Sequence, residues 1–237
     1  MGDPCGIGPE VVIKAVNALS GHDIRNIFLI GDLKLAIQNA RKFSLKYAVT
    51  PIREIKDFSK NSLNVMSLSD IDPLSIRHGK PDRDITEASL VYIDHAIKLS
   101  NEGIIGGFVT GPVNKNAISK IVPGFTGHTE YIAKKSNVNL PVMLMVSGNL
   151  KVIPLTTHIP LNRVTKAISS ELISSTLSIL DEDLSMYFDL KKPNIAVTGL
   201  NPHGGQDNFG LEENEKISPA IKSSRTKGIN ASGPYPA

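Results

Sequence analysis

Apolar residues recur along the chain in two alternating patterns. Apolar positions at helical spacing predict helices over residues 9–19, 32–43, 86–103, 129–136, 169–188 and 212–228. Short apolar runs between them predict strands over residues 26–31, 106–111, 142–147, 151–157 and 194–200. Strands that alternate with helices in this way favour an α/β fold with a largely parallel sheet.

Glycine and proline residues punctuate this pattern. Pro9 opens the first predicted helix, and Gly103 closes the third. Gly148-Asn149 separates two apolar runs and predicts a hairpin, the one antiparallel feature of the pattern. The stretch "IVPGFTG" interrupts the alternation, so we expect one α/β lobe over residues 1–120 and a second over residues 121–237.

Composition excludes several classes of protein. Hydrophobic residues make up 41% of the chain and charged residues 21%, which is typical of a soluble globular protein. The net charge of +3 is small and its basic residues are scattered, so we expect no nucleic-acid partner. No apolar run is long enough to span a membrane. The single cysteine, Cys5, cannot form an internal disulfide and suits a reducing cytoplasm.

Six histidines stand in two kinds of setting. Three lie in polar turns or inside a predicted helix, where a surface or core role is the simplest interpretation: His22, His78 and His95. The other three follow an apolar run or a glycine: His128, His158 and His203. Ligands of open α/β sheets bind at such strand ends, and imidazole suits divalent transition metals. The long spacings match no short metal motif, so a metal site and incidental placement both remain open.

Two glycine-rich stretches invite a similar comparison. "GDPCGIGPE" leads into a helix and is either an anion-binding turn or a tight turn alone. It is not the dinucleotide fingerprint, because Val11 stands at the third glycine position, and no P-loop lysine follows. "TGPVNK" ends a predicted strand, and Lys115 is a weaker candidate partner for a phosphate or carboxylate. The chain has no Gly-x-Ser-x-Gly elbow, and Cys5 has no activating partner, so a nucleophilic hydrolase is disfavoured.

Taken together, the motifs resemble those of one family. Six of them occur in order along nearly the whole chain: "GDPCGIGPE", "TGPVNK", "FTGHTEYIA", "TTHIPL", "GLNPHGG" and "GPYPA". This series resembles the 4-hydroxythreonine-4-phosphate dehydrogenases of vitamin B6 (pyridoxal phosphate) biosynthesis. The resemblance implies a cytoplasmic homodimer with two α/β/α lobes, similar to isocitrate and isopropylmalate dehydrogenases. That fold binds NAD, or NADP, without the usual glycine fingerprint.

The resemblance also implies site residues and a reaction. His128 and Thr129 match the family's substrate-binding pair, and His158 and His203 match two of its three metal-binding histidines. The implied cofactors are NAD(P) and a divalent metal (Zn, Mg or Co), and the implied substrate is a small phosphorylated amino acid, 4-phosphooxy-L-threonine. Its oxidation gives a β-keto acid, 2-amino-3-oxo-4-(phosphooxy)butanoate, which loses carbon dioxide to form 3-amino-2-oxopropyl phosphate.

The chain departs from the family pattern at several points. Gly204-Gly205-Gln206 stands where Ala-Gly-Glu is usual, and Asp207-Asn208 replaces a small, glycine-rich pair. Family members also have a strand before "GDP" and a segment beyond "GPYPA" that carries the third metal histidine. We therefore expect a two-lobed fold that is truncated at its C-terminal end, and a chain close to inactive by itself.

Three other functions stay open on the residues alone. A related dehydrogenase of phosphorylated threonate or erythronate shares most of these motifs. A metal-dependent phosphohydrolase would use the same histidines without NAD. The third alternative is an inactive remnant or a binding module.

Overall fold

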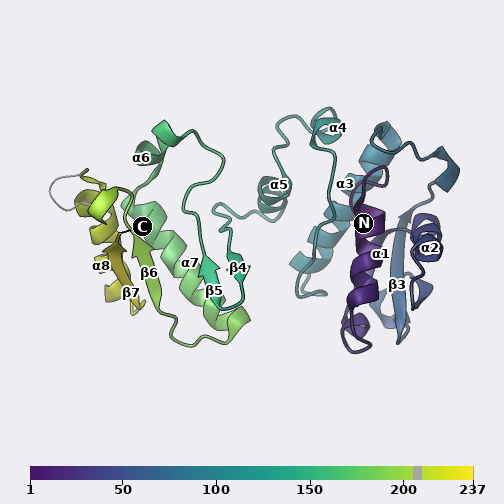
Figure 1. The fold of residues 1–237 in the computed structure, drawn as a ribbon, viewed down its shortest axis with the longest axis horizontal. Helices are drawn as coiled ribbons and strands as arrows, with labels where there is room; N and C mark the ends of the chain where they lie inside the picture. Colours follow the sequence, from purple (N-terminus) through teal and green to yellow (C-terminus); the bar gives the residue numbers. More distant parts are fainter. Residues whose placement is uncertain (205–209, 237) are drawn as a thin grey trace. The chain divides into compact units, whose positions relative to one another are not determined.

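The computed structural model describes residues 1–204 and 210–236. The chain forms two compact units, Met1–Asn139 and Leu140–Ala237, each of which is described by itself. The division falls later than the boundary near residue 120 that the sequence suggested. The reason is that Phe125 and Tyr131 pack with Ile93 and Ile97 in one hydrophobic cluster of the first unit. Both units combine helices and strands, which confirms the predicted α/β class (Figure 1).

The first unit is built on a parallel sheet. Its strand order is β1-β3-β2, with Ile30 of β1 opposite Met66 of β3 and Thr50 of β2 opposite Asn64 of β3. The strands are β1 (Phe28–Asp32), β2 (Ala48–Ile52) and β3 (Ser62–Ser69). The helices are α1 (Gly8–Ala18), α2 (Leu33–Lys42), α3 (Arg83–Asn101), α4 (Lys115–Ser119) and α5 (His128–Lys135). Short 3₁₀ turns cover Asp23–Asn26, Ile55–Asp57 and Pro73–Ser75.

Local chemistry explains where these helices begin. Asp32 and Asp82 cap α2 and α3, since their carboxylates accept hydrogen bonds from the backbone N–H groups of Leu35 and Ile85. The first turn of α1 contains proline, as predicted. The apolar faces of α1 and α2 then pack with β1 and β3, and the central strand β3 is buried from Ser62 to Met66.

The second unit contains two separate strand pairs. The hairpin β4 (Met145–Ser147) and β5 (Leu150–Val152) is antiparallel and turns at Gly148, which has φ +55°, as predicted. A parallel pair is formed by β6 (Ile195–Thr198) and β7 (Ala231–Tyr235). Its helices are α6 (Val164–Ala167), α7 (Ser170–Phe188) and α8 (Ser218–Thr226), with a 3₁₀ turn at Leu161–Arg163 and a π-turn at Glu213–Ile217.

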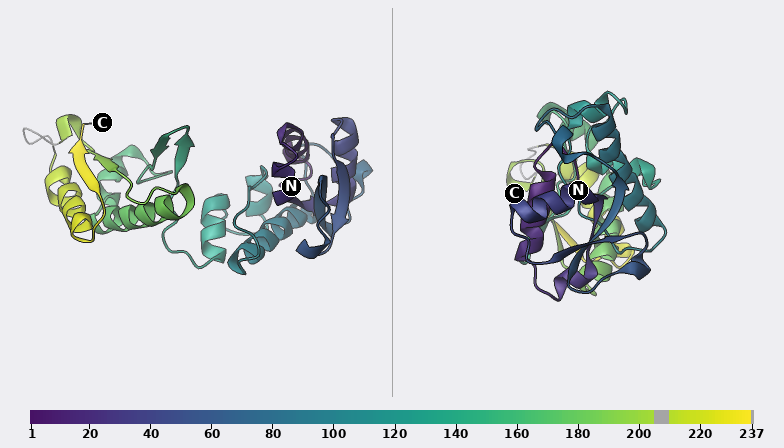
Figure 2. Two further views of the ribbon diagram at one scale, coloured as in Figure 1. Left: turned by 90° about the horizontal axis from the view of Figure 1, so that it is seen from below. Right: turned by 90° about the vertical axis from the view of Figure 1, so that its right-hand side faces the viewer.

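Helix α7 is the long element of this unit (Figure 2). Near its N-terminal end, Ile173 and Leu177 pack with Ile221 of α8 and Ile195 of β6. At its other end, the Nζ atom of Lys151 in β5 lies 5.1 Å from the ring centroid of Phe188. Within the described part of the chain, none of the helices combines the length and apolar character that crossing a bilayer requires.

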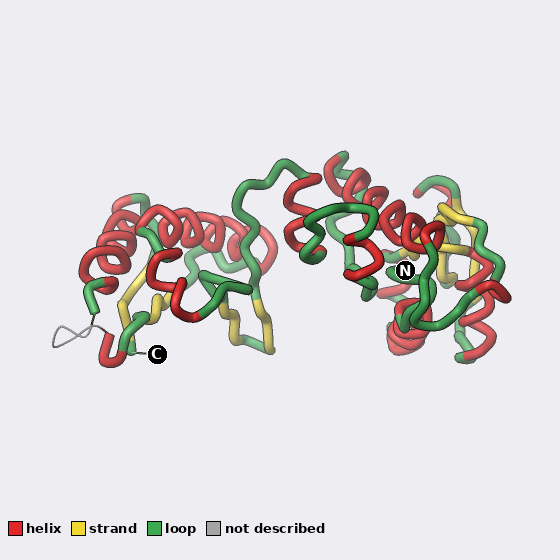
Figure 3. The backbone as a smooth tube through the Cα atoms, turned by 90° about the horizontal axis from the view of Figure 1, so that it is seen from above, coloured by secondary structure: helices red, strands yellow, loops and turns green. Residues whose placement is uncertain are grey.

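Three strand predictions need correction. Residues 106–111 form no strand, although Gly2 lies against Gly111 and Pro112. Strands make up a small part of the backbone (Figure 3). Among the described residues, a single backbone hydrogen bond, from Asp3 N–H to the Pro112 carbonyl at 2.8 Å, joins the start of the chain to the residue that follows this segment, and Val109 is 99% exposed. The strand expected over 151–157 ends at Val152, because Pro154 has no N–H for a ladder. The strand expected over 142–147 is limited to Met145–Ser147.

Candidate functional site

Helix α5 presents the first predicted pair of site residues. His128 is its first residue and Thr129 its second, and both side chains are half-buried. The Nε2 atom of His128 is buried and has no hydrogen-bond partner within the described residues. A buried polar atom without a partner is costly, so such an atom is a candidate contact for a ligand.

The rest of α5 is anchored to α3. The Tyr131 hydroxyl donates a hydrogen bond of 2.7 Å to one oxygen of Asp94, and Lys135 Nζ lies 3.0 Å from the other. The Tyr131 ring also packs against Phe125, with ring centroids 5.5 Å apart. These contacts hold the helix in the turns that follow His128.

The structure brings Lys115 close to this helix start. Lys115 is the first residue of α4, and its Nζ atom lies 3.5 Å from the point where a Cβ on Gly127 would be. Burial, and then the charge of Lys115, lower the pKa of His128 below its ordinary value. The imidazole is therefore neutral at pH 7, with one ring nitrogen that donates and one that accepts.

The predicted metal histidines lie in the second unit, on loops. His158 follows β5 and His203 follows β6, and both side chains are exposed. Each has φ +57°, a left-handed conformation that is uncommon for residues other than glycine. Such backbone strain is concentrated at functional sites, because the surrounding structure must hold it in place.

Glu213 is a buried acid close to the predicted metal loop, and the sequence did not reveal it. Its side chain is 1% exposed, and Oε1 accepts hydrogen bonds of 2.7 Å from the N–H groups of both Leu200 and Asn201. Oε2 accepts a third, of 2.9 Å, from the Asn201 side chain. Burial by itself would raise the pKa of Glu213, but these hydrogen bonds outweigh it and lower the pKa. An ionised carboxylate thus lies beneath the loop that carries His203.

The donor set for a metal fits in part. Imidazoles at His158 and His203 are suitable ligands for a divalent transition metal. Across residues 1–204 and 210–236, however, no group of three His, Cys, Asp or Glu side chains is placed to hold an ion. Gly205, Gln206, Asp207 and Asn208, where the chain departs from the family pattern, lie outside the described residues.

In the glycine-rich turn before α1, the Asp3 side chain accepts a hydrogen bond from the turn's own backbone. The Asp3 carboxylate accepts a hydrogen bond of 2.8 Å from Cys5 N–H, and the Asp3 carbonyl accepts one of 3.0 Å from Gly6 N–H. Burial raises the pKa of this carboxyl. A second anion would meet a carboxylate here, so the geometry favours a tight turn over an anion site.

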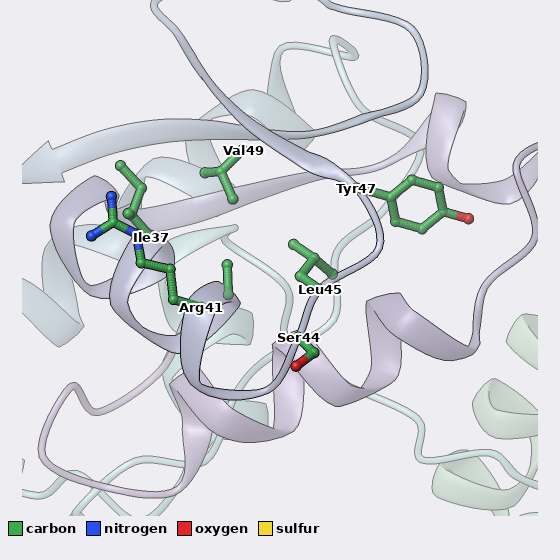
Figure 4. A pocket seen from close by; sticks show the side chains of 7 residues that line it. Ile37, Arg41, Ser44, Leu45, Tyr47 and Val49 are labelled. Carbon is green, nitrogen blue, oxygen red and sulfur yellow. The ribbon is translucent and has the colours of Figure 1, made fainter.

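An open hollow lies elsewhere in the first unit (Figure 4). It is formed where α2 ends and the chain returns toward β2, and its lining includes Ile37, Arg41, Leu45, Tyr47 and Val49. None of the predicted site residues lines it.

Comparison with known proteins decides the family. The model of the family described as "Pyridoxal phosphate biosynthetic protein PdxA" matches residues 23–237. The chain belongs to this family. A 4-hydroxythreonine-4-phosphate dehydrogenase of Desulforapulum autotrophicum is 34% identical over 242 residues, which cover all of this chain and 70% of that protein. The resemblance stated from the motifs, and the prediction of an oxidoreductase, are confirmed at the level of this PdxA family.

Two further comparisons bear on fold and substrate. The crystal structure of 4-hydroxythreonine-4-phosphate dehydrogenase from Klebsiella pneumoniae is similar to this chain, with a TM-score of 0.88 and 31% identity. The matched region covers all of this chain and 73% of the Klebsiella chain. A PdxA relative from Oceanobacillus iheyensis is 35% identical over 242 residues, covering all of this chain and 72% of that protein. It bears the name "Putative D-threonate 4-phosphate dehydrogenase". Overall identity therefore does not separate the two substrates.

Proposed function

We propose that this protein oxidises 4-phosphooxy-L-threonine with NAD, in a reaction that depends on a divalent metal. The C3–H bond breaks with its electron pair, which leaves as hydride for NAD, while the hydroxyl proton departs and a C3 carbonyl forms. The product, 2-amino-3-oxo-4-(phosphooxy)butanoate, then loses carbon dioxide to give 3-amino-2-oxopropyl phosphate. The observation that carries this proposal is the match of the whole chain to a dehydrogenase of that substrate at a TM-score of 0.88.

The first unit binds the phosphorylated substrate in this proposal. Neutral His128 donates a hydrogen bond to the substrate, and the Thr129 hydroxyl does the same from the first turn of α5. Lys115 adds positive charge beside them. The support is the buried Nε2 atom of His128, which has no hydrogen-bond partner in the part of the chain that the structure describes, together with the anchor that Tyr131 makes to Asp94. Preorganised donors of this kind hold a substrate in a reactive orientation.

The second unit supplies ligands for the metal. His158 and His203 would hold the cation through imidazole nitrogens, which suit zinc or cobalt better than magnesium. A divalent cation, when bound, acts as a Lewis acid toward the substrate hydroxyl, and NAD accepts the hydride. The support from this chain is the left-handed backbone at both histidines. We also propose that the protein is a homodimer in the cytoplasm. Light scattering of the purified protein will check the dimer.

The test is the formation of NADH from 4-phosphooxy-L-threonine by the full-length protein. Reactions are run with Zn²⁺, Co²⁺ or Mg²⁺, with and without a chelator, and with NADP in place of NAD. We expect metal-dependent NADH formation accompanied by release of carbon dioxide. Release of inorganic phosphate without NADH would instead identify a phosphohydrolase.

A second candidate is oxidation of D-threonate 4-phosphate. The relative from Oceanobacillus iheyensis favours it, because its identity to this chain is as high as that of the other relatives. The two substrates differ at C2, where one has an amino group and the other a hydroxyl. Comparison of kcat/KM for both compounds, and for erythronate 4-phosphate, decides between them.

A further inference from the structure

Hydrogen bonds to the end of β7 and to Glu213 hold the loop that carries His203. Gly199 N–H donates a hydrogen bond of 2.7 Å to the Tyr235 carbonyl, which joins the end of β6 to the end of β7. Leu200 and Asn201 then donate their N–H groups to Glu213. A Cβ on Gly199 would lie 3.1 Å from Glu213 Oε1 and 3.1 Å from Gly204 Cα, so only glycine fits without displacement.

Glu213 itself is held by an unusual backbone. It opens the π-turn Glu213–Ile217, and Ile217 at the end of that turn is buried in the core of the second unit. π-Turns are rare and are often found at functional sites. Glu213 binds the backbone of Asn201, and only Pro202 lies between Asn201 and His203 in the sequence. The path from the carboxylate to the histidine is therefore short.

The geometry requires a group that only accepts hydrogen bonds. Both Glu213 oxygens face N–H donors, two from the backbone and one from the Asn201 side chain. A carboxylate accepts at both oxygens, whereas the amide of glutamine would place an NH₂ group against one of these donors. A second acid, Glu212, also accepts from the Asn201 side chain at 3.0 Å, but it is only half-buried, whereas Glu213 is buried.

We propose that Glu213 is a positioning residue that holds the turn Leu200–Asn201 and thereby directs His203 toward the metal. This inference rests on the proposed function, since it takes His203 to be a metal ligand. Residues that orient a ligand from behind typically change metal affinity by about 10- to 100-fold when they are removed. Glu213 does not contact substrate or metal in this scheme, and it acts through the backbone of the loop.

The experiment compares Co²⁺ binding and thermal unfolding in the full-length protein. In Glu213→Gln we expect the dissociation constant for Co²⁺, followed by the visible absorption of the ion, to rise by about 10-fold or more. At saturating Co²⁺, the KM for 4-phosphooxy-L-threonine should stay near the wild-type value. The matched control is Ile173→Val, a core substitution in the same unit, which should lower Tm without weakening Co²⁺ binding.

The outcomes separate this inference from the proposed function. If Glu213→Gln lowers Tm and binds Co²⁺ as wild type does, Glu213 is structural only and the inference is overturned. If His203→Ala retains full affinity for Co²⁺, the proposed metal site itself is wrong. Should Glu213→Gln fail to fold, Glu213→Asp keeps the charge but shortens the side chain, which withdraws the carboxylate from the N–H groups of Leu200 and Asn201. A Co²⁺ affinity in Glu213→Asp that is weakened several-fold supports the inference, and an unchanged affinity overturns it.

Discussion

The two units hold their histidines in opposite ways. In the first, His128 begins a regular helix whose later residues are anchored to α3 through Asp94. In the second, His158 and His203 stand in loops, are exposed, and have left-handed backbone conformations. One kind of site relies on a helix, and the other on loop backbone that neighbouring residues must constrain.

This difference suits the two proposed roles. A substrate that enters and leaves needs donors that stay in place while they are empty, and the start of an anchored helix provides them. Metal ligands must converge on one point from distant parts of the sequence, which loops at strand ends can do. Loop placement has a cost, because the left-handed conformation is unfavourable and depends on contacts such as those of Glu213.

The largest expected effect comes from removing a loop histidine. In His203→Ala or His158→Ala, we expect bound metal and turnover to fall together, by more than about the 100-fold that a missing supporting residue costs. Metal content by mass spectrometry and the rate of NADH formation measure the two effects. His22→Ala, a surface histidine near Asp23, is the matched control and should change neither. Full metal content in both loop variants would refute the assignment.

Removal of the helix histidine should have a smaller and different effect. A hydrogen bond to a charged group contributes about 1.5–3 kcal/mol, so kcat/KM in His128→Ala should fall by roughly 10- to 150-fold. Steady-state kinetics measure this loss, and metal content should remain normal. A variant that loses metal but keeps its substrate affinity would reverse the roles given to the two units.

The anchor of α5 should matter less for activity than for stability. Tyr131→Phe removes the hydrogen bond to Asp94, and we expect the free energy of unfolding of the first unit to fall by about 1–2 kcal/mol. Chemical denaturation measures the change, with Tyr187→Phe, at an exposed tyrosine of the second unit, as control. Equal stability of the two variants would show that α5 does not depend on this contact.

The smallest effect is a pH dependence of stability. Burial and the nearby Lys115 lower the pKa of His128 from 6.5, so at mildly acidic pH the unfolded chain binds a proton that the folded chain does not. The unfolded state is then favoured, and stability falls as the pH drops from about 6.5 through the lowered pKa. Wild type should lose more stability than His128→Gln between pH 7.5 and pH 5 in thermal melts. Parallel curves for the two proteins would contradict the buried, neutral state of His128.

Local sequence was sufficient for most helices. Apolar spacing and capping residues determine where α2, α3 and α7 lie, since those signals act within a few residues. Strand β3 was missed because Ser62 and Asn64 are polar and yet buried. Asn64 satisfies its side chain by accepting from Ser59 N–H and donating to the carbonyls of Ser59 and Ser62. Strand β7 was missed because its glycine and proline are typical of a turn.

The sequence by itself determined the α/β class, the family, and the glycine-rich and proline-rich surroundings in which His158 and His203 stand. Only the tertiary structure decided which groups hold these residues. Nothing in "LEENEK" marks Glu213 rather than Glu212 or Glu215 as the buried acid. That choice depends on a π-turn and on donors more than ten residues away in the chain. The anchor of His128 likewise joins α5 to Asp94, a contact between segments 37 residues apart. Such contacts form only when the elements pack, because short-range patterns carry no information about distant partners.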